Sequence, residues 1–240
     1  MRVAVLSDIH ANLVALDAVL GSIGSVDAVW HLGDVVGYGP EPDAVVERLK
    51  AIKASGVRGN HDAAALGGRE IDWFNPDARA AMEWTRSTIK PSTRAWLEAL
   101  PEVHVNDEFT LVHGSPRDPM WEYITSPAVA RANLAVLKTR FGLHGHTHVP
   151  VVFRDDGRGV NAVNPAAGST VTLDERPALI NPGSVGQPRD GDPSASYLVL
   201  DTAAATCSWA RIAYDIGTVQ EAMSALRLPP RLVERLSFGI

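Results

Sequence analysis

Apolar runs and amphipathic segments alternate over the first 60 residues. Residues 2–6 are apolar after Arg2, as in a strand buried on both faces of a sheet, and 27–32 are predicted to form a second strand. Hydrophobic positions recur at helical spacing over 12–20 and again from 42 to about 56, and 57–58 can add a short third strand. The order strand, helix, strand, helix, strand predicts a parallel sheet with right-handed crossovers.

The rest of the chain divides into a helical part and a mostly β part. Residues 63–100 carry the helix-start signals Asn75-Pro76 and Lys90-Pro91, so we expect two helices inserted there. Further strands are predicted at 103–105, 109–113, 141–144, 151–153, 169–173, 178–181, 197–201 and 208–212, and further helices at about 126–138 and 218–226. The stretch 154–164 is rich in Gly and Asp, which is typical of a loop. We therefore expect one domain over 1–240 with a helical insertion at about 63–100.

Composition narrows the class of protein. The chain is 45% hydrophobic and 21% charged, which is ordinary for a globular protein. Apolar runs fall short of the roughly 20 residues that a membrane helix requires, and residues 1–8 are too short and too polar for a signal peptide. Together with a single cysteine, Cys207, these features predict a cytoplasmic protein without membrane contact. The formal net charge of −6 argues against general nucleic-acid binding.

Five short polar motifs each follow an apolar run. They are Asp8-Ile9-His10, Gly33-Asp34, Gly59-Asn60-His61-Asp62, His113-Gly114 and Gly145-His146-Thr147-His148. Because ligands of open α/β sheets gather at the carboxyl ends of the strands, we expect these motifs to meet in space. The neighbouring glycines allow positive φ angles and close backbone approach around a crowded centre. Carboxylate, amide and imidazole groups together can hold a pair of divalent metal ions, which activate water against phosphate esters.

In this order, the five motifs resemble the pattern of the calcineurin-like metallophosphoesterase superfamily. The similarity extends to 33–40 and 180–186, which resemble the bacterial and archaeal phosphodiesterase-like branch. The resemblance implies an α/β fold in which two β-sheets form a sandwich flanked by helices, an α/β/β/α arrangement. It also implies a dimetal site at the carboxyl-terminal edge of the strands.

The resemblance also implies a role for each motif residue. One metal would be held by Asp8, His10, Asp34 and His148, and the second by Asp34, Asn60, His113 and His146. Asp34 would therefore bridge the two ions, and a hydroxide held between them would attack phosphorus in line. His61 is not needed as a ligand and would steady the phosphate or protonate the leaving oxygen.

Outside the ligand set, three residues are candidates for substrate contact. Arg117 and Arg189 carry the guanidinium group suited to phosphate, and Tyr38 follows the bridging aspartate closely. In the phosphoprotein phosphatase branch, an aspartate three residues after the bridging aspartate orients the catalytic histidine, but here that position is Gly37. The tryptophans of the inserted segment (Trp73, Trp84 and Trp96) are predicted to form its core, with a lid or a dimer surface as the alternative.

These features predict a metal-dependent phosphoesterase acting on a small phosphate ester or nucleotide. The branch resemblance favours phosphodiesters; a phosphomonoesterase or nucleotidase, or a dinucleoside polyphosphate hydrolase, is the alternative. A non-catalytic scaffold on the same fold is a third interpretation, which the presence of all seven ligand positions disfavours. We expect two divalent ions, with manganese first and iron, zinc, cobalt or nickel as alternatives, because the site offers nitrogen and oxygen but no thiolate.

Overall fold

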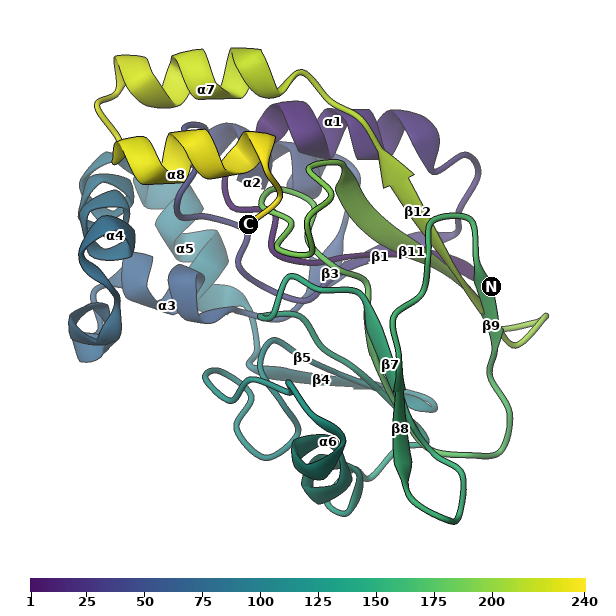
Figure 1. Cartoon of the computed structure of the whole chain (residues 1–240). Helices are drawn as coiled ribbons and strands as arrows, with labels where there is room; N and C mark the ends of the chain where they lie inside the picture. Colours follow the sequence, from purple (N-terminus) through teal and green to yellow (C-terminus); the bar gives the residue numbers. More distant parts are fainter.

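The computed structural model describes the backbone of residues 1–240 and every side chain except those of Arg69 and Glu70. Over these residues the strands form two six-stranded sheets (Figure 1). The first sheet has the order β3 (Ser55–Gly56), β2 (Ala28–His31), β1 (Arg2–Leu6), β11 (Ala195–Asp201), β12 (Thr206–Ile212) and β9 (Thr170–Thr172). The second has the order β4 (Val103–Asn106), β5 (Phe109–Val112), β6 (Phe141–Leu143), β10 (Ala178–Asn181), β7 (Val151–Asp155) and β8 (Val160–Val163).

Each sheet has a parallel part and an antiparallel part. Strands β3, β2 and β1 are parallel, whereas β11, β12 and β9 continue the first sheet antiparallel. In the second sheet β5, β6 and β10 are parallel, and β4, β7 and β8 are antiparallel to their neighbours. The loops that leave β1, β2, β5 and β6 carry four of the five motifs, so the parallel parts of both sheets bring their carboxyl ends to one site.

Helices cover the outer faces of this sandwich. They are α1 (Leu13–Ser22), α2 (Pro42–Ala51), α3 (Asn60–Leu66), η1 (Arg69–Trp73), α4 (Pro76–Thr88), α5 (Pro91–Ala99), α6 (Pro127–Leu134), α7 (Ile216–Ala225), α8 (Pro230–Glu234) and η2 (Arg235–Ser237). Figure 1 shows α1, α7 and α8 on one side of the molecule and α6 on the opposite side. This layering confirms the expected α/β/β/α fold. Among the helices that the structure describes, none combines the length and hydrophobicity needed to cross a bilayer.

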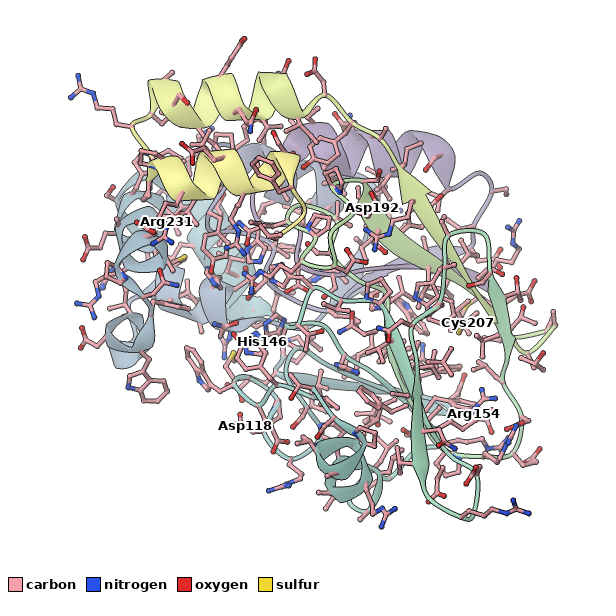
Figure 2. The ribbon with its side chains drawn as sticks, viewed as in Figure 1. Asp118, His146, Arg154, Asp192, Cys207 and Arg231 are labelled. Carbon is pink, nitrogen blue, oxygen red and sulfur yellow. The ribbon has the colours of Figure 1, made fainter. Side chains whose placement is uncertain are left out.

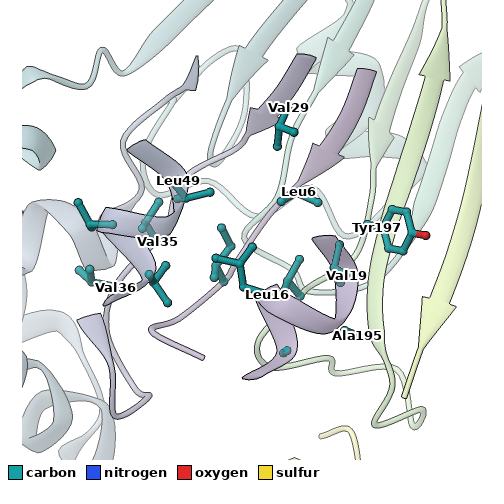
Figure 3. Close-up of a cluster of buried hydrophobic side chains, with 14 of the residues drawn as sticks. Leu6, Leu16, Val19, Val29, Val35, Val36, Leu49, Ala195 and Tyr197 are labelled. Atoms are coloured by element: carbon teal, nitrogen blue, oxygen red, sulfur yellow. The ribbon is translucent and has the colours of Figure 1, made fainter. Parts of the chain in front are cut away.

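Alternate residues of β1 show how the sandwich buries two cores. Val3 and Val5 point between the sheets, where they join side chains such as Leu198 and Phe109 in one hydrophobic cluster. Leu6, which has the opposite orientation, joins the cluster that packs against the helices on the outer face. Figure 3 shows Leu16 and Val19 of α1 and Leu49 of α2 around Leu6 in this outer cluster. Because β1 is buried on both faces, the loop that follows it is held rigidly.

Two sequence-based expectations are wrong in detail. Helix α2 ends at Ala51 rather than near Gly56, because the chain turns at Lys53, whose φ is 54°, and pairs with β2 through Ser55–Gly56. The stretch 154–164 is not a loop: β7 and β8 pair across it, and Asp156 closes the turn by accepting from the backbone N–H groups of Arg158 and Gly159.

The segments 63–100 and 227–240 hold more helix than expected. The inserted segment contains the end of α3, the short η1, and α4 and α5, rather than two helices alone. The C-terminal α8 and η2 were not predicted. Their anchors are Leu232 and Leu236, one helical turn apart, which pack into a cluster with Tyr38.

Candidate metal centre

Hydrogen bonds between the loops after β1 and β2 place the first two motifs side by side. The backbone N–H of Asp8 donates to the carbonyl of Gly33 at 3.2 Å, and that of His10 donates to the carbonyl of Asp34 at 2.9 Å. The parallel pairing of the strands therefore continues past their ends and delivers both carboxylates to the same point.

Five residues of these motifs adopt a backbone conformation that non-glycine residues rarely adopt. Positive φ angles occur at Asp8 (52°), His10 (49°), Asp34 (50°), His146 (66°) and His148 (60°). Each costs on the order of 1 kcal/mol and persists only where the surrounding contacts enforce it. Such strain concentrated on five motif residues points to a site shaped for function rather than for stability.

The first cluster of potential ligand atoms comprises Asp8, His10, Asp34 and His148. These atoms all lie within 4.8 Å of one another, and all four side chains are buried. Nε2 of His148 lies 3.3 Å from Oδ1 of Asp8 and 3.2 Å from Nε2 of His10. Nε2 of His10 lies 3.6 Å from Oδ2 of Asp34. The distances match a group of donors arranged around a single cation.

The second cluster comprises Asp34, His113 and His146 and shares Asp34 with the first. Nε2 of His113 lies 3.4 Å from Oδ2 of Asp34, 3.0 Å from Nδ1 of His146 and 2.9 Å from Oδ1 of Asn60. The Asn60 amide oxygen thus lies beside this second group. The clusters identify a candidate site for two metal ions, with one carboxylate common to both.

The histidine rings are oriented by backbone carbonyls behind them. The Nδ1–H group of His113 can donate to the Leu32 carbonyl at 2.9 Å, and that of His148 to the Gln187 carbonyl at 2.5 Å. The Nε2–H group of His146 can donate to the Trp121 carbonyl at 3.2 Å. Each bond fixes the tautomer whose remaining nitrogen faces the cluster with its lone pair, as in histidines that bind metals.

The charge state of the centre suits cations. Burial lowers the pKa values of His10, His146 and His148 well below the usual range, so these rings are neutral at neutral pH and can offer lone pairs. Burial would also lower the pKa of His113, but Asp34 and Asp8 outweigh it and raise that pKa to about 9, so a cation would have to displace a proton in order to bind this ring.

Several potential ligand atoms of the site lack a suitable partner within the protein. Oδ1 of Asp8 is buried without a hydrogen-bond partner among the described residues, and such an atom is costly unless a ligand satisfies it. Nearby, two pairs of imidazole nitrogens face each other: His10 with His148, and His113 with His146. A divalent cation in each cluster would satisfy these atoms, so the residues present fit two bound metals.

Two motif glycines are required because the backbone is crowded rather than because φ is positive. A β-carbon on Gly59 would lie 2.1 Å from Oδ1 of Asp34, and one on Gly145 would lie 1.9 Å from Oγ of Ser7. Neither glycine has a positive φ, although Gly33 does, with φ of 87°. The expectation of close approach is confirmed at both positions, and the expectation of positive φ fails there.

His61 lies in the first turn of α3, at the edge of the centre. Its backbone N–H donates to Oδ1 of Asp34 at 2.9 Å, and its ring lies 4.9 Å from that of His10 and 4.3 Å from that of Tyr38 between centroids. Nδ1 of His61 lies 3.1 Å from the sulfur of Met82. Burial lowers the pKa of His61 to about 4. The ring is therefore beside the clusters without belonging to either.

Gly37 explains why no aspartate orients His61. A β-carbon at this position would lie 2.7 Å from Nδ1 of His61 and 2.8 Å from the Met82 sulfur, and φ is 91°. Any larger residue would therefore displace the ring. Asp62 does not contact the ring either: its carboxylate accepts from the backbone N–H groups of Val36 and Gly59, at 3.0 and 2.9 Å, and ties α3 to the bridging loop.

A polar cavity of about 290 Å³ opens over the two clusters. Its lining comprises Asp34, Tyr38, His61, Trp73, Phe74, Asn75, Tyr123, His146, His148, Arg189 and Arg235. Figure 2 shows His146 near the middle of the molecule, between the helical side that carries α4 and α8 and the side that carries α6. The cavity therefore joins both halves of the fold, and it collects residues from the inserted segment and from the C-terminal helices.

The structure separates the three candidate substrate contacts. Tyr38 and Arg189 line the cavity, and the Arg189 guanidinium lies 5.9 Å from the centre of the Tyr38 ring. Arg117 does not line it. Its guanidinium is 3.6 Å from Glu122 and about half exposed, because the loop after His113 turns the side chain away from the metal ligands.

The tryptophans of the inserted segment also differ from one another. Trp84 and Trp96 are half-buried and pack against hydrophobic clusters, as predicted. Trp73 is 70% exposed, and its ring contacts Trp121 with 5.0 Å between centroids. Its assignment to the core of the segment was wrong, because η1 ends at the cavity mouth rather than between helices.

Several residues of the site had no signal that sequence reasoning used. Arg235 belongs to the unpredicted C-terminal helical segment, and the Tyr123 ring stacks on that of His146 at 3.7 Å from an irregular loop. Ser184 donates to the backbone carbonyl of Asp8 at 2.8 Å, so the loop after β10 supports the first motif.

Comparison with known proteins defines the class that this fold and site represent. A family model described as the calcineurin-like phosphoesterase superfamily domain matches residues 1–205. The chain belongs to this family, and it is a metal-dependent phosphoester hydrolase.

Individual relatives extend the match over the rest of the chain. An uncharacterized protein of Methanocaldococcus jannaschii, MJ0912, is 36% identical over 245 residues, which cover 99% of this chain and 98% of that protein. The crystal structure of a metallophosphoesterase from Sphaerobacter thermophilus superposes with a TM-score of 0.93 at 42% identity and covers 100% of this chain and 99% of that one. The phosphodiesterase YfcE of Escherichia coli K12 is 29% identical over 84% of this chain and 88% of its own length.

Proposed function

We propose that the seven motif side chains hold two divalent cations and that the enzyme hydrolyses small phosphodiesters. The observation that carries the proposal is the position of Asp34, whose carboxylate belongs to both ligand clusters. A carboxylate with two oxygens can serve two ions at once, so the clusters form one dinuclear centre rather than two separate sites. The assignment gives Asp8, His10, Asp34 and His148 to one ion and Asp34, Asn60, His113 and His146 to the other.

The bound cations and the histidine rings would have different roles in the reaction. When bound, the two cations acidify a water for attack on phosphorus and offset negative charge on the phosphoryl oxygens. Water adds to phosphorus, the ester P–O bond breaks, and the leaving oxygen takes up a proton, so a diester yields a monoester and an alcohol. The neutral rings of His10, His146 and His148 keep their lone pairs available for this arrangement.

His61 and Arg189 are the residues proposed to contact the substrate. Both line the cavity beside Asp34, and His61 is held by its backbone hydrogen bond to that carboxylate. The Arg189 guanidinium can donate to non-bridging phosphoryl oxygens. His61 steadies the phosphoryl group, and donation of a proton to the leaving oxygen stays a prediction for this ring.

The diester preference rests on similarity to relatives that carry this activity in their names. YfcE is named a phosphodiesterase. Manganese is the proposed metal because nitrogen and oxygen donors without thiolate suit it, and a cytoplasmic location stays a prediction from the sequence.

The test is the hydrolysis of two chromogenic esters by the purified enzyme, first stripped of metal and then supplied with one metal at a time. We expect Mn²⁺ to restore activity and bis-p-nitrophenyl phosphate to be hydrolysed with a higher kcat/KM than p-nitrophenyl phosphate. A higher kcat/KM for the monoester would overturn the diester assignment and favour a phosphatase or nucleotidase. Restoration of activity by Zn²⁺, Fe²⁺, Co²⁺ or Ni²⁺ but not by Mn²⁺ would overturn the assignment of manganese and leave the proposed reaction unchanged.

A further inference from the structure

Two arginines enter the cavity from segments that are far apart in the chain. Arg189 lies in the loop after β10, and Arg235 is the first residue of η2 near the C-terminus. Both line the 290 Å³ cavity together with Asp34, His146 and His148. Arg235 lies outside residues 1–205, the part of the chain that the family model matches. It is therefore a feature that the family pattern does not cover.

Arg189 forms no ion pair with an acidic side chain among the described residues. Its Nη2 donates to Oε1 of Gln187 at 2.9 Å, and its Nε is buried without a hydrogen-bond partner. The Tyr38 ring lies under the guanidinium. Elsewhere in the chain, half-buried arginines pair with acids, as Arg211 does with Asp190. The positive charge of Arg189 thus faces the cavity with hydrogen-bonding capacity to spare.

Arg235 is held in place by the packing of its own segment. Leu232 and Leu236 are buried beside Tyr38. Their packing fixes the orientation of the segment that carries Arg235. Nε of Arg235 donates to the carbonyl oxygen of Ile240. Burial and the nearby charge of Arg189 lower the pKa of Arg235 to about 10, so the side chain remains a cation at neutral pH. Two like charges are therefore held in one cavity against their mutual repulsion.

A second cavity shows which way the bound anion would extend. It has a volume of about 580 Å³ and is lined by Asn75, Pro76, Asp77, Arg231, Leu232, Arg235 and Ile240. Asn75 and Arg235 line both cavities, so Arg235 lies at the junction between them. Figure 2 shows Arg231 on the side of the molecule that carries α4 and α8. A substrate whose reacting phosphorus lies over the ligand clusters would place its next charged group at Arg235.

We propose that Arg189 and Arg235 form a subsite for a second phosphate, so that the substrate is an ester or anhydride carrying a phosphate next to the reacting one. Nucleotides with a phosphate chain are the chemical class that fits. The proposal rests on the proposed function, because the reacting phosphate is placed on the metal centre. Arg235 acts here as a specificity-determining residue.

AMP and ADP are the matched probes for this subsite, because they differ by one phosphate. Each is measured as an inhibitor of bis-p-nitrophenyl phosphate hydrolysis at a fixed free Mn²⁺ concentration, and by calorimetric titration into the metal-loaded protein. In the wild type we expect ADP to bind about tenfold more tightly than AMP, because its additional phosphate makes charge-assisted contacts with the two guanidinium groups. The Arg235→Gln variant should lose most of this ratio, and Arg235→Lys should keep an intermediate ratio.

Arg117→Gln is the matched control, because Arg117 is about half exposed and lines neither of the two cavities. It removes the same charge and should leave the ADP/AMP ratio within about twofold of the wild type. Equal affinities for ADP and AMP in the wild type, or an equal loss of ratio in both variants, would overturn the subsite. Calorimetry separates this failure from failure of the proposed function. If ADP binds preferentially in an Arg235-dependent way but no ester is hydrolysed, the subsite proposal stands and the phosphodiesterase proposal is overturned.

Discussion

The floor and the rim of the cavity are built in different ways. The floor is formed by the seven motif side chains, all at most 3% exposed, of which Asp34, His146 and His148 line the cavity itself. The loops of the floor are hydrogen-bonded to one another through the backbone. The rim includes Trp73, 70% exposed, and Tyr123, 48% exposed, and it comes from the inserted segment, an irregular loop and the C-terminal helices. The floor therefore has one arrangement set by strand ends, whereas the rim is held by local packing. We therefore expect the floor to carry the chemistry common to the family and the rim to determine selectivity for a substrate.

The largest effect is expected from the shared carboxylate of the floor. The Asp34→Asn variant keeps the shape of the side chain but removes the charge that both clusters use, so we expect kcat/KM on bis-p-nitrophenyl phosphate to fall at least about 100-fold. Circular dichroism and the melting profile of the metal-free protein should show a folded chain. Asp107→Asn, in an exposed turn with φ of 48°, is the control and should keep full activity. Full turnover in Asp34→Asn would contradict the shared role.

Crowding of the floor predicts the next effect. Gly59→Ala places a β-carbon 2.1 Å from Oδ1 of Asp34 without any change in the allowed φ, so the clash is purely steric. We expect a loss of about 2–3 kcal/mol in the free energy of unfolding, measured by urea titration. Gly21→Ala, in a helix with nothing within 4 Å of the added carbon, should instead stabilise by about 0.5–1 kcal/mol. A tolerated Gly59→Ala would mean that the bridging loop is looser than the structure has it.

A buried histidine beneath the floor makes stability depend on pH. Burial lowers the pKa of His31 to about 4, and both of its ring nitrogens are buried without hydrogen-bond partners among the described residues. The unfolded chain binds a proton near pH 6.5 and the folded chain does not, so stability is complete above that pH and falls as the pH drops toward 4. For metal-free protein we expect His31 to contribute a loss of about 2 kcal/mol between pH 7.5 and pH 5.

The measurement is a urea titration of the wild type and of His31→Gln at both pH values. The variant should lose less stability than the wild type on going to pH 5, whatever its stability at pH 7.5. Equal losses would show that the ring is not held neutral. His144, whose pKa burial also lowers to about 4, should give a similar difference in its own Gln variant.

The rim should show the smallest effect on stability. Trp73→Ala removes a side chain that is mostly exposed, so the free energy of unfolding should change by less than about 0.5 kcal/mol. Trp209→Ala, with a ring that is 2% exposed and donates to the carbonyl of Asn181, should cost about 3–5 kcal/mol. A loss of more than about 2 kcal/mol at Trp73 would mean that the rim is part of the core and that the contrast between the two regions is wrong.

The same contrast explains what could be predicted from the sequence. Strand β1 was predicted correctly because its buried residues after Arg2 are all apolar, as in a strand buried on both faces, and the motifs at strand ends then had to meet at one edge. The fold class, the family and the enzyme class were confirmed. The ligand assignment to two ions and the limits of a single domain stay predictions.

The rim could not be predicted because its residues meet through packing between distant segments. Nothing in the local sequence separates Arg117, which turns toward Glu122, from Arg189, which enters the cavity. The position of Trp73 depends on where η1 ends relative to the loop that carries Trp121. Arg235 reaches the cavity because Leu232 and Leu236 dock beside Tyr38, a contact that spans almost 200 residues of sequence.

An anomalous difference map from crystals soaked in Mn²⁺ tests the central claim most directly. The account expects two manganese peaks roughly 3.5–4 Å apart, with the Asp34 carboxylate between them. One peak should be surrounded by Asp8, His10 and His148, and the other by Asn60, His113 and His146. A single peak, or peaks that do not share Asp34, would contradict a dinuclear centre.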